Sequence, residues 1–417
     1  MSIRQALRLT LLGGAAACMA AGGGAQAAEV SLDEALAAAR DNLDLRIAAH
    51  GVDAARADIA AADHAPLPQL SAKLSQIDLQ NGIGPGSLLG GKRIDKGVGL
   101  DWTWERGGKR GLRTEAARHG AGAAEADRDE LRLQQLLATQ AAFFDLLAAQ
   151  GRREQLQAIE GSARQTLDIA RRRMNAGDAA LQDAARAEVE AERAAADTLS
   201  AQLDLQRAQF VLAQLTGRGD AATLQAHGDW PADDAGSEAT ALEARVAQRA
   251  DVHAAEERVR AAEAALAGAS ALRQGDVTWG ASFDHYPGTS TRQVELRLSM
   301  PLAFGYHYDG EAERARAQLG QAQDQLEKVR ALALIELQRL AAERTAAARR
   351  AQRYDGDIVP RSREVAARAE LAYGKGALSL TELLDARRTL RAVLLDALAA
   401  HADLAKASGA WRLRNGA

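Results

Sequence analysis

The histidines are the first candidates for chemistry in this chain, because imidazole serves as a metal ligand and as a general base near neutral pH. None of the eight stands four residues from another, the spacing that places two zinc ligands on one helical face. They are His50, His64, His119, His227, His253, His285, His307 and His401. Only His307, between two tyrosines, has a suggestive setting, and interfacial aromatics at a strand-to-helix corner explain it better. The histidines therefore predict neither a catalytic centre nor a metal site.

Other reactive patterns are equally sparse. Gly107-Gly108 lacks the surrounding residues of a phosphate-binding loop, so a tight corner that needs positive φ explains it better. The single cysteine, Cys18, excludes a disulfide framework and a cysteine-based zinc site. The formal net charge of −4 argues against nucleic-acid binding. We therefore expect no enzyme, no cofactor and no nucleic-acid partner.

The N-terminal residues 1–27 have the pattern of a secretory signal peptide. Arg4 and Arg8 precede an apolar segment, and Ala25-Gln26-Ala27 offers small residues for cleavage. A short buried helix is one alternative, and lipoprotein processing at Cys18 is another. No other stretch has the ~20 continuous apolar residues of a membrane-spanning helix. The sequence thus predicts an exported protein.

The elements that must position any functional residue are long helices. The chain of 417 residues is 47% hydrophobic but only 4% aromatic, which is typical of long-helix proteins. From Lys109 to Met174 there is no proline, and leucines recur at helical spacing. A turn follows at 175–178, where Gly177 fits a C-cap and Asp178 an N-cap, and a second helix returns to Gly217.

Ahead of this hairpin, the sequence predicts a helix and then two strands. Ser31 and Glu34 form a capping box, and the helix continues toward Ala62. Segments 70–79 and 98–105 alternate apolar and polar residues around a Gly-rich loop, so a β-hairpin spans 66–105.

The same order of predicted elements then occurs a second time. A helix over 239–269, a β-hairpin over 274–303, a long helix with a kink at Pro360 and a return helix to Gly409 follow in order. Gly107 and Gly177 are 70 residues apart, and Gly305 and Gly376 are 71 apart. The return arms of 40 and 33 residues differ by one heptad. We predict a tandem duplication: 28–217 as first repeat, 218–238 as irregular connector and 239–417 as second repeat.

Four strands of this length suit a membrane barrel shared between subunits, because a bilayer admits only helices or closed barrels. The last strand has an apolar face, Val294 to Leu302, opposite Glu295 and Arg297. A sheet on a soluble core would give the same alternation. The predicted fold class is mainly α with β, with long antiparallel helical hairpins.

This organisation resembles the TolC-like outer-membrane efflux proteins over the whole mature chain. The segment Glu105-Arg-Gly-Gly-Lys-Arg110 with Arg113 is similar to the strand-to-helix junction of the cobalt–zinc–cadmium resistance branch, and Met300-Pro301-Leu302 before Glu311 and Arg314 points the same way. The resemblance implies a homotrimer with a twelve-stranded outer-membrane β-barrel and a periplasmic α-barrel. It also implies a periplasmic adaptor and an inner-membrane pump of the resistance-nodulation-division type.

The implied function is a passive exit duct in the outer membrane, with divalent heavy-metal cations as the expected cargo. A duct for drugs, for organic solutes or for type I secretion remains open. A periplasmic coiled-coil adaptor or scaffold is a further alternative, although adaptors carry one hairpin and not two near-equal units.

Three groups of residues are candidate sites. For the tip turns and adaptor docking they are Gly177, Asp178, Leu181, Gly374, Gly376 and Leu380. For charges that gate the closed tip they are Arg173, Asp183, Glu370, Glu382 and Asp385. For the strand-to-helix corner they are Glu105, Gly107, Gly108, Lys109, Arg110 and Gly305. Lys109, Arg110 and Arg113 could meet anionic lipid headgroups at this corner, or form a solvated helix start.

Overall fold

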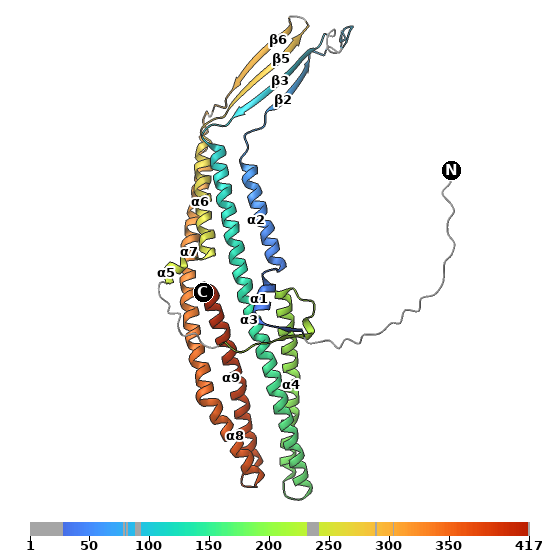
Figure 1. Cartoon of the computed structure of the whole chain (residues 1–417). Helices are drawn as coiled ribbons and strands as arrows, with labels where there is room; N and C mark the ends of the chain where they lie inside the picture. Colours follow the sequence, from blue (N-terminus) through green and yellow to red (C-terminus); the bar gives the residue numbers. More distant parts are fainter. Residues whose placement is uncertain are drawn as a thin grey trace, which may run out of the picture.

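The protein is long and narrow, with a β-sheet at one end and, at the other, the two turns that join α3 to α4 and α8 to α9 (Figure 1). The computed structural model describes residues 28–77, 80, 82–87, 93–231, 242–287, 290–302 and 304–415. The expected signal peptide 1–27 and the connector residues 232–238 lie outside this range. Within it, no helix combines the length and apolar character needed to cross a membrane.

The longest element is α3 (Lys109–Asn175), a helix of 67 residues that runs from the sheet to the far tip. Helix α4 (Leu181–Thr216) returns beside its lower part. The buried face of α4 is built mainly of alanine and leucine at helical spacing, so the two backbones can approach closely. The predicted long hairpin is confirmed.

The second half repeats this hairpin with one irregularity. The descending helix is α7 (Asp309–Arg353), a π-helical turn (Tyr354–Ile358) and α8 (Val359–Gly374), followed by the returning α9 (Leu380–Asn415). The lengths of 45, 5 and 16 residues match the 67 of α3 to within one residue. The π turn lies directly ahead of Pro360, which has no N–H to donate to the preceding turn.

Helix α9 does not end at Gly409, and the predicted seven-residue difference between the return arms is wrong. Both return helices have 36 residues, because α9 continues to Asn415. Gly409 is buried at the contact with α3, where a Cβ would collide with the side chain of Gln140. This glycine thus makes room for a neighbouring helix and does not cap its own.

The helix that precedes each sheet hairpin is broken, whereas the sequence predicts it as continuous. The first half has α1 (Leu32–Ala39) and α2 (Leu43–Ala62), and the second has α5 (Leu242–Val246) and α6 (Ala250–Ala271). Asn42 caps α2 by accepting from Asp44 N at 3.0 Å, and its amide donates to Leu215 O at 2.9 Å. Arg249 holds the equivalent N-cap position of α6.

The four long strands form one antiparallel sheet in the order β2-β3-β5-β6. They are β2 (Gln69–Ser75), β3 (Asp95–Trp104), β5 (Val277–Tyr286) and β6 (Ser290–Ser299). The two hairpins join through β3 and β5, where Val98 pairs with Phe283 and Trp102 with Trp279. Because β6 ends at Ser299, Met300 and Leu302 lie beyond the strand, contrary to the sequence prediction.

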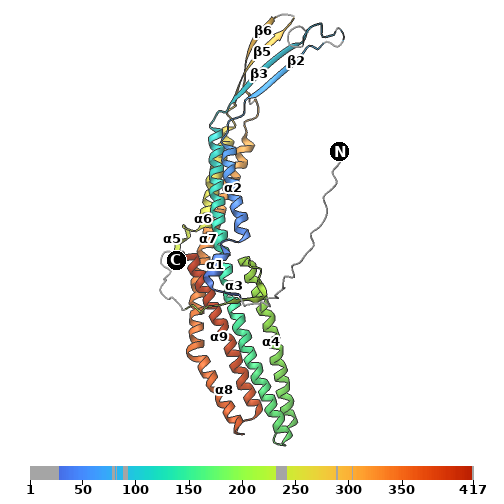
Figure 2. The same cartoon turned by 45° about the vertical axis from the view of Figure 1, so that its right-hand side comes forward.

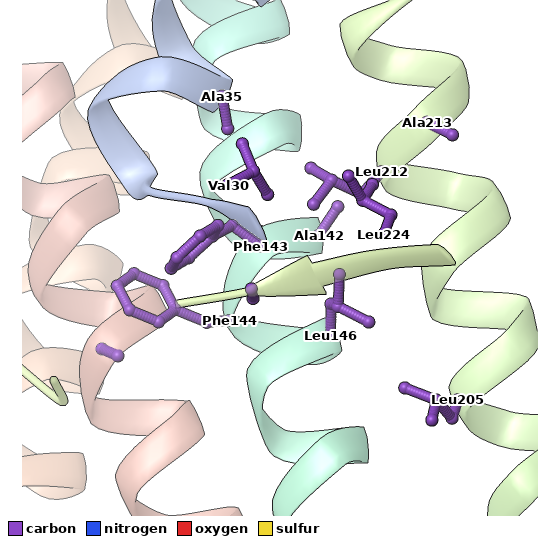
Figure 3. Close-up of a cluster of buried hydrophobic side chains, with 12 residues drawn as sticks. Val30, Ala35, Ala142, Phe143, Phe144, Leu146, Leu205, Leu212, Ala213 and Leu224 are labelled. Carbon is purple, nitrogen blue, oxygen red and sulfur yellow. The ribbon is translucent and has the colours of Figure 1, made fainter. Parts of the chain in front are cut away.

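The largest buried cluster lies halfway along the molecule. Phe143, Leu146 and Leu212 from α3 and α4 enclose Val30 and Leu224 (Figure 3). Val30 and Leu224 belong to two short strands that pair in parallel, β1 (Ala28–Val30) and β4 (Leu224–Ala226). Strand β4 directly follows the 3-10 turn η1 (Ala221–Thr223). Figures 1 and 2 both show this pair crossing the helices at mid-height. The connector is thus anchored to the helical layer.

Candidate functional site

The two faces of the sheet differ in polarity. One face carries large exposed apolar side chains from all four strands: Leu70, Leu74, Val98, Leu100, Trp102, Trp104, Trp279, Phe283, Val294, Leu296 and Leu298. The other face carries glycines, hydroxyl groups, two cations (Lys73 and Arg297) and four carboxylates: Asp95, Asp101, Asp284 and Glu295. An exposed apolar face of this size needs a nonaqueous partner, and the opposite face suits water.

The polar face is held by its own ion pairs and hydrogen bonds. Arg297 Nη2 lies 3.0 Å from Asp101 Oδ1, and its other nitrogen lies 3.7 Å from Glu295. Asp284 is only 3% exposed and accepts from Ser282 Oγ at 2.6 Å. Glycines opposite Asp284 and Asp101 give these carboxylates room, because a Cβ at either position would collide with them. The small neighbours let acidic groups lie flat over the sheet.

The first strand-to-helix corner is a set of internal ion pairs. Lys109 Nζ lies 2.7 Å from Asp276 Oδ1, and Arg110 Nε lies 2.9 Å from Asp63 Oδ1. The hydrogen bond from Arg110 holds the pKa of Asp63 below its usual range. Lys109 and Arg110 thus each have a carboxylate partner within the chain. Contact of these cations with lipid headgroups stays a prediction.

The same corner binds its strand end to its helix start. Arg113 Nη1 donates to Glu105 Oε1 at 2.8 Å, and this hydrogen bond raises the pKa of Arg113. Gly107 and Gly108 have φ of +77° and +67°, as the sequence predicts for a tight corner. The predicted corner residues therefore share one local structure that fixes the angle between sheet and helix.

The second corner achieves the same connection with aromatic residues. Gly305 has φ of +77°, and Tyr306 donates its hydroxyl to Glu311 at 2.6 Å. This hydrogen bond lowers the pKa of Glu311. Arg273 pairs with Asp309 at 2.7 Å and reaches the His307 carbonyl at 3.1 Å. His307 thus contributes its backbone here, in keeping with its interpretation as a corner residue.

The two tip turns are built alike. Gly177 and Gly376 have φ of +83° and +72°, and the following residues donate to carbonyls five positions earlier, Asp178 N to Arg173 O and Ala377 N to Ala372 O. This is the left-handed C-cap arrangement that favours glycine. The prediction that Asp178 caps the next helix is wrong, since α4 begins after Ala180 and no side chain caps it.

The other predicted docking residues have unequal settings. Gly374 is the last residue of α8 and not part of the left-handed turn. Leu181 and Leu380 are the first residues of α4 and α9, yet Leu181 is 76% exposed and Leu380 only 5%. Leu380 packs in the cluster that joins the two hairpins, whereas Leu181 remains available to a partner.

Most predicted gate charges have partners within the chain. Arg173 lies over the Tyr373 ring at 4.8 Å, and Glu370 pairs with Arg387 at 2.9 Å. Glu382 accepts from the Ser379 hydroxyl at 2.7 Å and from Ser379 N at 3.0 Å in a capping box, and these hydrogen bonds lower the pKa of Glu382.

Two predicted gate charges are less constrained. Asp385 stands 3.5 Å from Arg388 and is exposed. Asp183 has no ion pair or side-chain hydrogen bond among the described residues.

Sequence reasoning missed the residues that join the two hairpins near the tips. Arg388 Nη2 lies 2.6 Å from Glu190 Oε2, and Arg186 donates to Thr381 Oγ1 at 2.9 Å. Arg387 reaches Ser162 O at 3.2 Å. These partners stand about two hundred residues apart in the chain, so no local spacing could have identified them.

One known protein family matches part of the chain. Residues 32–218 match the family described as outer membrane efflux protein. No match is found among curated protein sequences.

Solved structures share the fold along most of the chain. The channel CusC is 18% identical, with a TM-score of 0.77 over 92% of this chain and 91% of its own. VceC from Vibrio cholerae is 20% identical, with a TM-score of 0.75 over 92% and 96%. MtrE from Neisseria gonorrhoeae is 21% identical, with a TM-score of 0.75 over 92% and 88%.

These findings confirm the predicted fold class, and they do not single out the heavy-metal branch. Members of the matched family are passive channels and not enzymes. The match to the outer membrane efflux protein family covers residues 32–218, which is less than half of the chain. The long helical hairpins and the four-stranded sheet agree with the fold of the solved channels.

Proposed function

We propose that this protein is the outer-membrane exit duct of a tripartite efflux system and works as a homotrimer. Residues 1–27 act as a cleaved export signal in this proposal. Three sheets form a twelve-stranded barrel with the apolar face toward lipid, and the helices continue it as an α-barrel in the periplasm.

The observation that carries this proposal is that the sheet and the helical layer both end in unpaired edges, one on each side of the chain. In the sheet, β2 and β6 each have one unpaired edge among the described residues. Below the sheet, α2 and α4 lie along one side, and α7 with α8 lies along the other (Figure 1). A layer with complementary edges closes into a ring by head-to-tail association, which removes every free strand edge.

The exposed apolar residues on these side helices support ring closure. Large side chains are exposed on α2 and α4, on one side, and on α7 and α8, on the other. They are Leu43, Ile47, Val189, Leu199, Leu203, Phe210, Val211, Leu332, Ile335, Val365 and Leu371. Such residues are costly in water and favourable between subunits.

A periplasmic adaptor and an inner-membrane pump of the resistance-nodulation-division type are the proposed partners. Exposed Leu181 beside Gly177 offers an apolar contact at the tip, where an adaptor would dock. The gate role of Asp183 and Asp385 also remains a proposal, and these two acidic side chains have the fewest constraints.

Divalent heavy-metal cations are the proposed cargo. The resemblance of residues 105–110 to the cobalt–zinc–cadmium branch supports this choice, and so do the four carboxylates on the polar face, which would line the lumen. Deletion of the gene should lower tolerance to cobalt, zinc or cadmium salts and leave tolerance to drugs unchanged. The opposite pattern would favour the duct for drugs or organic solutes, and loss of a secreted protein would favour type I secretion.

The duct itself is tested on purified protein. Detergent extraction from the outer membrane should yield a trimer whose electrophoretic mobility changes on heating, and the trimer should conduct ions in a planar bilayer. Recovery of the mature protein in the soluble periplasmic fraction would support the adaptor or scaffold alternative and refute the duct.

A further inference from the structure

An ion pair on the polar face joins the two sheet hairpins. Arg297 of β6 donates from Nη2 to Asp101 Oδ1 of β3 at 3.0 Å. In the sheet register both residues pair with Gly280 of β5, so their side chains meet above the strand that lies between them. Arg297 thus connects the second repeat to the first across three strands.

Gly280 leaves the room that this bridge needs. A Cβ at this position would collide with Asp101 Oδ1 and would come within 3.3 Å of Arg297 Nε and Nη2. A glycine inside a strand often marks a place where another group approaches the backbone closely. The arrangement therefore depends on the residues of three strands together, and a side chain on β5 would separate the two charges.

A second carboxylate shares the same guanidinium. Arg297 Nη1 lies 3.7 Å from Glu295 Oε1, which belongs to the residue two positions earlier on β6 and on the same face. The side chains of Arg297 and Glu295 are both 47% exposed, so solvent reaches them. Arg297, Asp101 and Glu295 form a charged group, the Arg297 cluster, in which two carboxylates and one guanidinium leave one net negative charge.

The Arg297 cluster lies nearer the helices than the other charges on the polar face of the described strands (Figure 1). The next row toward the helices holds hydroxyl groups: Thr103 and Thr278, whose oxygens are 2.9 Å apart, and Ser299. Lys73 and Asp284, which both pair with Gly97, lie further from the helices. The cluster is therefore the first charged row of the sheet on the side of the helical layer.

We propose that Arg297 sets the ion preference of the duct at the point where the duct enters the sheet. This inference rests on the proposed function, which directs the polar face to a water-filled lumen shared by three subunits. Rings of charged side chains select ions by the sign of their charge. Three Arg297 clusters give a ring of three negative charges, whereas the same ring without the guanidinium groups would carry six. Arg297 thus keeps the preference for cations moderate.

The test measures the reversal potential of the purified channel in a planar bilayer that separates two KCl concentrations. Arg297→Gln should raise the potassium-to-chloride permeability ratio by about twofold or more, because the negative charge of the ring doubles. Asp101→Asn should lower this ratio, because Arg297 then neutralises Glu295. Arg297→Gln combined with Asp101→Asn leaves one carboxylate per subunit and should match wild type. All shifts should shrink at high salt, where screening is strong.

Lys96→Gln is the matched control, because Lys96 shares the apolar face with Val98 and removal of its charge leaves the lumen unchanged. An equal shift of the permeability ratio in this control would refute the inference. So would unchanged ratios in both single variants, or a double variant that behaves like Arg297→Gln. If Arg297→Gln does not insert, Asp101→Asn still tests the inference with the opposite sign. Absence of channels in wild type refutes the duct, whereas conducting variants with the wild-type ratio refute this inference alone.

Discussion

Gly409 shows how a single missing side chain can set the distance between two helices. It lies on α9 where a Cβ would meet the side chain of Gln140, which itself donates to Ala405 O at 2.9 Å. The contact joins the second repeat to α3, the central helix of the first. The glycine is therefore required by packing, although its backbone is ordinary helix.

Gly409→Ala should destabilise the protein by about 1–3 kcal/mol, because overpacking displaces Gln140 and its hydrogen bond. Gly161→Ala is the control: it lies inside α3 with nothing within 4 Å of the added Cβ. That change should be neutral or stabilising by up to ~1 kcal/mol. Thermal unfolding followed by circular dichroism measures both, and equal melting temperatures for the two variants would contradict the packing role.

Leu298 and Arg297 are neighbours on β6 that should respond oppositely to mutation. Leu298 is exposed on the apolar face, so Leu298→Asp should disfavour membrane insertion by roughly 2 kcal/mol. Arg297 faces Asp101 and Glu295 on the other side, so Arg297→Gln should insert normally. The amount of folded protein in outer-membrane fractions reports both. Similar yields for the two variants would mean that the lipid and lumen faces are wrongly assigned.

Local chemistry decides which single residues the sequence could predict. Gly177 and Gly376 end helices with positive φ, a requirement visible in the sequence around them. Asp178 fits an N-cap by type, but the chain needs two more residues before α4 begins. As a glycine, Gly409 was expected to end its helix, but it instead packs against Gln140, some 270 positions away in the chain. Such long-range contacts leave no local trace.

At the scale of elements, α4 and α9 meet through Glu190 and Arg388. The hydrogen bond from Arg388 holds the pKa of Glu190 below its usual value of 4.5. A carboxyl with a lowered folded-state pKa stabilises the fold above its unfolded pKa and loses that contribution as the pH falls through the folded value. The α4–α9 contact should therefore loosen below about pH 4.5 and be unaffected between pH 6 and 8.

Hydrogen exchange of α4, corrected for the intrinsic rate, tests this expectation. Protection around Glu190 should fall between pH 6 and pH 4 in wild type and should be low at both pH values in Glu190→Gln. Glu188→Gln is the control, because Glu188 pairs with Arg171 inside its own hairpin and is half exposed. Protection in wild type that does not change with pH would show that the Glu190 ion pair does not hold the hairpins together.

Hydrophobic periodicity and glycine spacing predicted the long helices and the strands well. They predicted the breaks within the helices that precede the sheet hairpins less well. Helices of 67 and 36 residues and four strands follow from patterns that extend over many turns. The breaks before α2 and α6 depend on one residue each, Asn42 and Arg249. Arg249 pairs with Asp251 and with Glu336 of α7, both at 2.7 Å, so its capping position reflects tertiary contacts that the local sequence does not contain.

At the scale of the whole molecule, the proposed assembly makes the chain one sector of a ring. Its sheet and its helical layer are open on both sides, and the two repeats stand side by side within it (Figures 1 and 2). Both halves supply one sheet hairpin and one helical hairpin with return helices of 36 residues, which is the pattern that the predicted tandem duplication requires. A closed ring needs further copies, since two repeats leave the edges of β2 and β6 unpaired within the described sheet.

Charges placed on the α4 side should therefore prevent assembly without unfolding the subunit. Leu203 and Phe210 are 47% and 59% exposed on α4, seven residues apart and on one helical face. Leu203→Glu with Phe210→Glu would bury two unpaired carboxylates between subunits, at a cost of roughly 3 kcal/mol or more per interface.

Gln157→Glu on α3, which lies inside the layer and is exposed, is the control. Light scattering of the detergent-solubilised protein should give monomers for the double variant and trimers for the control and wild type. Circular dichroism should show equal helix content in all three, because the altered side chains are not part of the subunit core. A double variant that remains trimeric would place the subunit contact on another surface and would remove the basis for head-to-tail closure through α4.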